Sequence, residues 1–186
     1  MRSLIACLPA ALLIAGCDRQ SAPAPQANET ATKAEPEAAG TLDISQRGSA
    51  MPTVAFEAPD GKRVTLAKFK GEPLLVNLWA TWCGPCVAEM PTLDALAERH
   101  AGKLQVLVVS QDINREKVDG WWARKSFKQL EKYLDTKSDL GFAFGTGMVP
   151  TTVLYDTQGK EVWRVIGGMD WDGPRANTLL AETVES

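Results

Sequence analysis

The sequence predicts a layered α/β domain, and three observations support that prediction. Near-continuous apolar runs at 73–80 and 103–110 have the length and composition of buried central strands. Between them, residues 84–101 repeat their apolar side chains at helical spacing. Two further strand patterns, at 151–155 and 161–166, are joined by a turn that contains glycine. Elements in this order are typical of a central mixed β-sheet flanked by helices.

Two more elements are expected at the start and in the middle of the domain. Apolar residues alternate over 54–58 and resume after the Asp-Gly turn at 60–61, which predicts an N-terminal β-hairpin. Residues 114–136 have the pattern of two charged, amphipathic helical pieces, broken near Gly120 or Ser126. We therefore expect a helical insert after the second central strand.

The first 16 residues have the pattern of a bacterial lipoprotein signal. Arg2 gives a positive start, and residues 4–15 form an apolar run that is too short for an ordinary membrane span. The run ends in Ile-Ala-Gly before Cys17, which resembles the lipoprotein box, where cleavage precedes a cysteine that carries diacylglycerol. Asp18 resembles the signal for retention in the inner membrane. An ordinary signal peptide cleaved elsewhere and an uncleaved anchor are the alternatives.

The composition changes after the signal and again near residue 44. Residues 17–43 contain no aromatic residue and are rich in Ala, Pro and Glu, so they cannot bury enough apolar surface to become ordered. We expect a lipidated cysteine and a disordered tether there, followed by one domain over 44–186. The domain carries the insert at about 111–138. It closes with a helix over 172–184, for which Asp172 supplies the N-cap.

Charge and cysteine content exclude several functions. With 20 basic and 23 acidic residues the net charge is -3, which argues against a nucleic-acid partner. Once Cys7 leaves with the signal and Cys17 is lipidated, Cys83 and Cys86 are the remaining thiols. A zinc site built only from cysteine needs four such ligands, and the single histidine excludes a His-rich centre. We expect no metal and no cofactor.

The motif Cys83-Gly84-Pro85-Cys86 lies between a predicted buried strand and a predicted helix. Cys83 therefore lies at a helix N-terminus, where free N–H groups and the helix dipole favour a thiolate, the attacking species in disulfide exchange. We assign Cys83 as the nucleophile and Cys86 as the more buried resolving thiol. The alternatives are an inert structural disulfide or half of a zinc site, and the strand-to-helix context and export signal favour the reactive pair.

Residues 79–86 resemble the active site of thioredoxins. Pro91 matches the proline that kinks the thioredoxin helix, and Val149-Pro150-Thr151 matches the loop whose proline is cis and faces the disulfide. The resemblance covers about residues 50–186 and implies a thioredoxin-like fold. It implies that substrate is contacted by the residues around the disulfide, namely Trp82, Gly84, Pro85, Val149 and Pro150.

The C-x-x-E-x-P pattern at 86–91 resembles the TlpA/ResA-like proteins of the redoxin family, which are membrane-tethered, extracytoplasmic thiol-disulfide reductases. Six residues before the first cysteine, thioredoxins carry a buried Asp, but this chain has Asn77, which cannot titrate. Glu89 is the replacement candidate, since a buried carboxylate near the sulfurs can take the proton of the resolving thiol. The alternative is a Glu that faces solvent.

The resemblance implies a reductase of disulfides in exported proteins, supplied with electrons by a membrane donor of the CcdA/DsbD type. The implied substrates are apocytochrome c and copper-site assembly proteins. The G-x-P-E-T pattern of dedicated cytochrome maturation proteins is absent, because residues 147–152 are Gly-Met-Val-Pro-Thr-Thr. We expect a monomer anchored by its lipid on the periplasmic side of the cell membrane.

Three other functions fit the sequence less well. A peroxiredoxin-like peroxidase needs Thr three residues before its reactive cysteine, but position 80 is Ala. Copper-binding assembly factors use C-x-x-x-C and a distant His, whereas this chain has C-x-x-C with His100 poorly placed. The intact cysteine pair argues against a non-catalytic tethered binding module.

Overall fold

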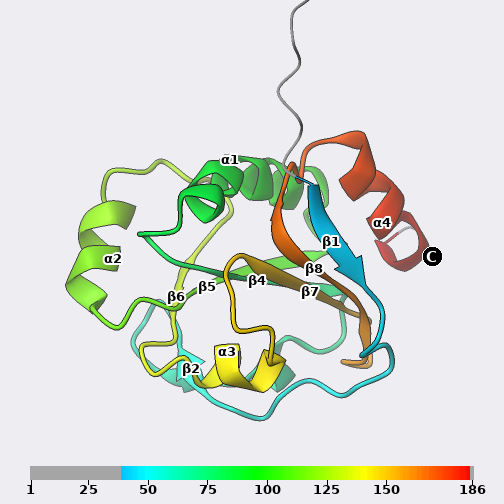
Figure 1. The fold of residues 1–186 in the computed structure, drawn as a ribbon, viewed down its shortest axis with the longest axis horizontal. Helices are drawn as coiled ribbons and strands as arrows, with labels where there is room; N and C mark the ends of the chain where they lie inside the picture. Colours follow the sequence, from blue (N-terminus) through cyan, green and yellow to red (C-terminus); the bar gives the residue numbers. More distant parts are fainter. Residues whose placement is uncertain (1–38, 185–186) are drawn as a thin grey trace, which may run out of the picture. The chain divides into compact units, whose positions relative to one another are not determined.

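The computed structural model describes residues 39–184, within which eight strands form one mixed sheet in the order β1-β8-β7-β4-β5-β6-β2-β3 (Figure 1). The strands are β1 Ala39–Asp43, β2 Phe56–Glu57, β3 Arg63–Val64, β4 Leu74–Trp79, β5 Gln105–Ser110, β6 Lys132–Leu134, β7 Thr151–Tyr155 and β8 Glu161–Met169. The helices are the 3-10 helix η1 Leu66–Phe69, α1 Gly84–Arg99, α2 Arg115–Trp122, α3 Asp139–Phe144 and α4 Pro174–Val184. The β4–β5 and β5–β6 pairs are parallel and the other pairs are antiparallel. The predicted α/β class with a mixed sheet is confirmed.

Strand β4 is buried along its whole length and separates two hydrophobic cores. Leu75 and Trp79 pack into the core beneath α1 and α4, whereas Val76 and Leu78 pack into the opposite core, which includes side chains of α3. Figure 1 shows α1 and α4 on one side of the sheet and α3 on the other. Because side chains alternate along a strand, Asn77 points to the α1 side.

Helix α1 begins where the sequence predicts and ends two residues earlier than the predicted residue 101. Cys83 is its N-cap, and the Cys83 side chain accepts a hydrogen bond from the Cys86 N–H. Met90, Leu93 and Leu96 are buried against the sheet at the expected helical spacing. The helix ends at Arg99, with His100 in the C-cap position.

The sheet begins earlier than the sequence predicts. The sequence predicts a disordered tether to residue 43, yet β1 pairs antiparallel with β8 and places Thr41 opposite Ile166. This pairing uses backbone groups, so the absence of a strong apolar pattern does not prevent it. A Cβ at Gly40 would lie 2.5 Å from Val165 Cγ1, so glycine permits the close approach. The predicted export signal and Cys17 lie outside the described residues.

The insert is only partly helical. Helix α2 confirms the first predicted piece, but the second is wrong, because β6 pairs parallel with β5 and antiparallel with β2. Tyr133 and Leu134 are buried in the sheet, so tertiary pairing outweighs the helical appearance of the local sequence. The predicted opening hairpin is confirmed by the antiparallel pair β2–β3. Helix α3 was not predicted.

The closing helix is shorter than expected. Helix α4 begins at Pro174, and the predicted N-cap Asp172 instead forms an ion pair with Arg99 of α1. The Asp172 carboxylate is therefore paired with a side chain of helix α1. Among the helices of residues 39–184, none is both long and apolar enough to cross a membrane.

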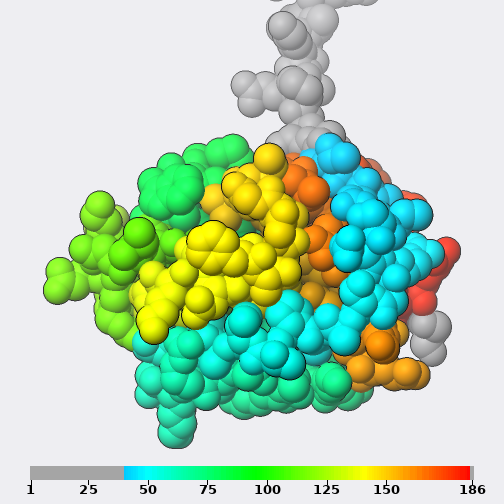
Figure 2. Space-filling view, turned by 60° about the horizontal axis from the view of Figure 1, so that its bottom comes forward, coloured from blue at the N-terminus to red at the C-terminus, as the bar shows by residue number. Residues whose placement is uncertain are grey.

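A buried ion pair ties α3 to the sheet. Arg164 of β8 donates to both oxygens of Glu161, at 2.6 and 2.7 Å, and to the carbonyl of Phe144 at 2.6 Å. A buried guanidinium needs such compensation for its lost hydration. Because Phe144 is the last residue of α3, this contact fixes the helix end. Figure 2 shows the yellow segment that contains α3 on the surface, next to the green segment that contains α1.

Candidate active site

Cys83 and Cys86 are joined by a disulfide at the N-terminus of α1. The Cys86 N–H lies 3.3 Å from Cys83 Sγ. Backbone N–H groups and the helix dipole at this end stabilise a negative charge on Cys83 once the disulfide is reduced. Cys86 is fully buried, whereas Cys83 keeps 6% of its surface exposed. Cys83 is therefore the sulfur that a partner can reach.

The loop before β7 lies against the disulfide. The Val149–Pro150 peptide bond is cis, as the resemblance to thioredoxins implies. The Val149 carbonyl oxygen lies 3.6 Å from Cys83 Sγ, and the Pro150 carbonyl accepts a hydrogen bond from Gly167 N–H at 2.9 Å. Gly167 has φ +97°, a conformation that glycine adopts without strain. These contacts hold the loop beside the sulfur.

The remaining predicted contact residues leave the disulfide open. Trp82 is 71% exposed, and Gly84 and Pro85 are also exposed. A Cβ built on Gly84 would meet no atom within 4 Å. The structure thus gathers the predicted residues around one accessible edge of the disulfide.

Asp112 supports this site, and the sequence reasoning missed it. Its buried carboxylate accepts hydrogen bonds from the backbone N–H and the hydroxyl of Thr81, at 2.8 and 2.7 Å, and from the Ser110 hydroxyl at 2.8 Å. These bonds fix the loop that carries Cys83. A signal was available, since β4 and β5 are adjacent parallel strands and the residues that follow them meet at one sheet edge.

Glu89 is buried on α1, so the alternative of a solvent-facing side chain is wrong. It is 4% exposed and accepts hydrogen bonds from Asn77 Nδ2 at 2.7 Å, Met169 N–H at 3.0 Å and Trp171 Nε1 at 3.2 Å. Burial raises the pKa of Glu89 to about 7, although the three hydrogen bonds lower it. The carboxyl can therefore gain and lose a proton near neutral pH.

Asn77 can hydrogen-bond to the Glu89 side chain in both of its protonation states. Its Nδ2 donates to Glu89 and to Thr152 Oγ1 at 2.9 Å, while its buried Oδ1 has no hydrogen-bond partner within residues 39–184. All three partners of Glu89 are donors, which suits the carboxylate, but the protonated acid needs an acceptor. A half-turn of the Asn77 carboxamide brings Oδ1 towards Glu89 and provides one.

Glu89 and Cys86 are three residues apart on α1, so they lie on the same face of the helix, and both are buried. One turn further, the Thr92 hydroxyl donates to the Glu89 carbonyl at 2.8 Å and accepts from Trp171 N–H at 3.1 Å. Trp171 is 82 residues from Glu89 in sequence, and no local pattern indicates that contact. Within residues 39–184, no group of three or more His, Cys, Asp or Glu side chains could hold a metal ion.

The sequence profile of the Redoxin family matches residues 46–180. The chain belongs to the Redoxin family. It is 33% identical over 132 residues to the thiol-disulfide oxidoreductase ResA of Bacillus subtilis. The match covers 70% of this chain and 73% of that protein. It is 34% identical over 136 residues to the thiol:disulfide interchange protein DsbE of Pseudomonas aeruginosa, with 69% and 74% covered.

Two solved structures share the fold of this chain. A structure from Chlorobium tepidum that carries the name DsbE superposes with a TM-score of 0.68 at 23% identity and covers 77% of this chain and 99% of its own. The exposed lipoprotein thioredoxin Etrx1 of Streptococcus pneumoniae superposes with a TM-score of 0.59 at 27% identity, covering 68% and 96%. The thioredoxin-like fold is confirmed, and the chain is a thiol-disulfide oxidoreductase.

The buried Glu89 makes stability depend on pH. Its pKa rises from 4.5 to about 7 on folding, so the folded protein binds this proton more tightly than the unfolded chain. The resulting stability is complete below pH 4.5 and is lost as the pH rises through 7. A shift of this size corresponds to about 3 kcal/mol. The free energy of unfolding of the oxidised protein, relative to Glu89→Gln, should therefore fall by about 3 kcal/mol between about pH 4 and 9.

Denaturant titrations of both proteins at each pH measure this difference. Glu98→Gln is the matched control, because Glu98 is an exposed residue of the same helix, and its profile should run parallel to that of the wild type. Parallel profiles for the wild type and Glu89→Gln would contradict the raised pKa.

Proposed function

We propose that this protein is a membrane-tethered, extracytoplasmic reductase of disulfides in exported proteins. The observation that carries the proposal is the buried Glu89 carboxyl on the same helix face as Cys86, behind a disulfide whose other sulfur is accessible. A dithiol that must close into a disulfide needs a proton acceptor at its buried thiol, and Glu89 has the required burial and pKa.

In the first step, the Cys83 thiolate attacks one sulfur of the substrate disulfide. A bond forms between Cys83 and that sulfur, the substrate disulfide breaks, and the second substrate sulfur leaves as a thiolate. The position of Cys83 at the helix N-terminus and its limited exposure support this role. Trp82, Gly84, Pro85, Val149 and Pro150 form the proposed contact surface for the substrate.

In the second step, Cys86 gives its proton to Glu89 and attacks the Cys83 sulfur. The Cys83–Cys86 disulfide forms, the mixed disulfide breaks, and the remaining substrate sulfur leaves with its electrons. Two electrons have then passed from the enzyme to the substrate. A dithiol donor must reduce the enzyme again, and we propose a membrane protein of the CcdA/DsbD type.

The dipeptide between the cysteines supports reduction of the substrate as the direction of transfer. Gly84-Pro85 is the thioredoxin dipeptide, and thioredoxin has a potential of about -270 mV. An exported reductase acts where disulfides are otherwise kept oxidised, so it needs specific substrates. We propose apocytochrome c or copper-site assembly proteins for this role. A peroxidase is disfavoured because position 80 is Ala and the Thr81 hydroxyl is bound to Asp112.

The experiment that tests this function combines a redox titration with substrate trapping. The Cys83–Cys86 pair should have a potential of about -270 mV, and Cys86→Ala should accumulate mixed disulfides with exported proteins through Cys83. The double variant Cys83→Ala/Cys86→Ala is the control and should trap nothing. A potential above about -180 mV, or the same adducts with the double variant, would contradict a reductase.

The proposed tether predicts where the protein is found. Cys17 follows a lipoprotein box, and a structural relative is named an exposed lipoprotein. Cell fractionation should place the wild type with membranes and Cys17→Ser in the soluble or secreted fraction, with equal disulfide reductase activity. Labelled fatty acid should be incorporated into the wild type and not into Cys17→Ser, and equal labelling of the two proteins would contradict a lipid anchor at this residue.

A further inference from the structure

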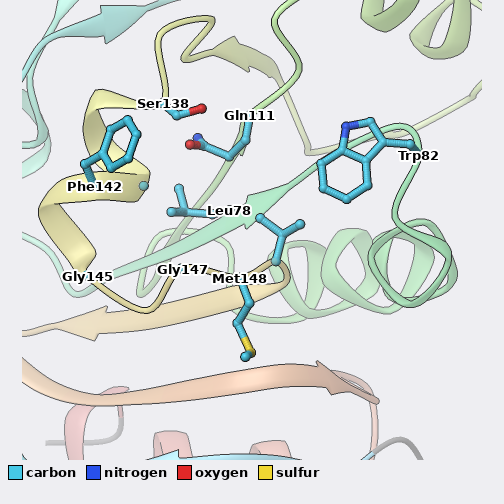
Figure 3. Close-up of a pocket in the computed structure, with 10 residues that line it drawn as sticks. Leu78, Trp82, Gln111, Ser138, Phe142, Gly145, Gly147 and Met148 are labelled. Atoms are coloured by element: carbon cyan, nitrogen blue, oxygen red, sulfur yellow. The ribbon is translucent and has the colours of Figure 1, made fainter.

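An open pocket of about 380 Å³ lies on the face of the sheet opposite Glu89, close to the loop that carries Cys83, and Figure 3 shows the residues that line it. Its lining comes from the end of β4, the loop after β5, α3 and the loop before Pro150. Trp82, next to Cys83, and Val149, whose carbonyl contacts Cys83, both line it. The pocket is therefore lined by one sequence neighbour of Cys83 and by the residue whose carbonyl contacts its sulfur.

The rim of the pocket is apolar and exposed. Trp82, Phe142 and Met148 line the pocket, and each is more than half exposed. Figure 3 shows Trp82 on one side of Gln111 and Phe142 on the other, with Met148 below. Large apolar side chains gathered around one opening mark a surface that a partner covers. No charged side chain lines this pocket, so it suits a neutral group.

The floor of the pocket carries one polar side chain without a partner. Gln111 is 9% exposed, and neither its Oε1 nor its Nε2 makes a hydrogen bond to the described residues. A Cβ on Gly141 would lie 2.6 Å from Oε1, so the absence of a side chain there makes room for the carboxamide. Figure 3 shows this carboxamide between Ser138 and Leu78. An unpaired buried amide is costly, and a bound ligand group can satisfy it.

We infer that this pocket binds an aromatic side chain of the substrate polypeptide that carries a hydrogen-bonding group, as tyrosine does, next to the cysteine under attack. The apolar rim covers the ring, and Gln111, which can both donate and accept, binds the polar end. The inference rests on the proposed function, since it requires a polypeptide disulfide at Cys83. The inference adds that disulfides with such an aromatic residue next to the attacked cysteine are reduced fastest.

The test uses the reduced full-length protein and three synthetic peptides. Each peptide contains one internal disulfide and differs only in the residue that flanks both cysteines on the outside, which is Ala, Phe or Tyr. Covering the ring should make the Phe peptide about tenfold faster than the Ala peptide. The hydrogen bond to Gln111 should make the Tyr peptide about fivefold faster than the Phe peptide. Rates follow from peptide reduction under single-turnover conditions.

Two variants separate the contribution of the hydrogen bond to Gln111 from that of covering the aromatic ring. Gln111→Met keeps the size of the side chain and removes its polar atoms, so it should abolish the advantage of Tyr over Phe and keep that of Phe over Ala. Gly141→Ala should also reduce the Tyr advantage, because its methyl group displaces the carboxamide, while alanine suits helix α3. Gln158→Met is the matched control, since Gln158 is exposed in the β7–β8 turn.

The outcomes distinguish the inference from the function on which it rests. Equal rates for the three peptides, or a Tyr advantage that survives in Gln111→Met, would overturn the inference while leaving the reductase intact. If none of the peptides is reduced, including the Ala peptide, the proposed function fails and the inference fails with it.

Discussion

The buried carboxyl of Glu89 is the constraint on which the site depends. Three donors, from β4, from the last residue of β8 and from Trp171 after it, converge on this one group of α1. Together they attach the active-site helix to the sheet behind the disulfide. Burial raises the pKa of Glu89 to about 7, so the same group that positions the helix can exchange a proton with a neighbour.

The sheet separates two tasks at the disulfide. Consecutive residues of β4 point to opposite faces, with Asn77 hydrogen-bonded to Glu89 on one side and Leu78 lining the proposed substrate pocket on the other. In the proposed mechanism, the proton of Cys86 moves on the α1 side, while the substrate approaches Cys83 from the α3 side. The buried strand β4 between them allows the proposed proton site and the proposed apolar binding site to lie within one small region.

The sequence predicts those parts that depend on local pattern. The central strands, α1, the cysteine pair and the cis proline follow from apolar periodicity or from a short motif. Strand β1 could not be predicted, because its contacts with β8 are made by backbone, and β6 is a strand only because β5 and β2 flank it. Gln111 and Trp171 lie beside residues that are far away in sequence, so no local pattern marks them as part of the site.

The most direct test of the central claim is the rate at which Cys86 resolves a mixed disulfide. Reaction of the reduced protein with an aromatic disulfide reagent loads Cys83, and the attack by Cys86 then releases a second coloured thiolate at a rate independent of reagent concentration. In the wild type this rate should rise as the pH passes through about 7, the pKa of Glu89. In Glu89→Gln it should be at least about 100-fold slower and lack that inflection. An unchanged rate and pH profile in Glu89→Gln would contradict the account.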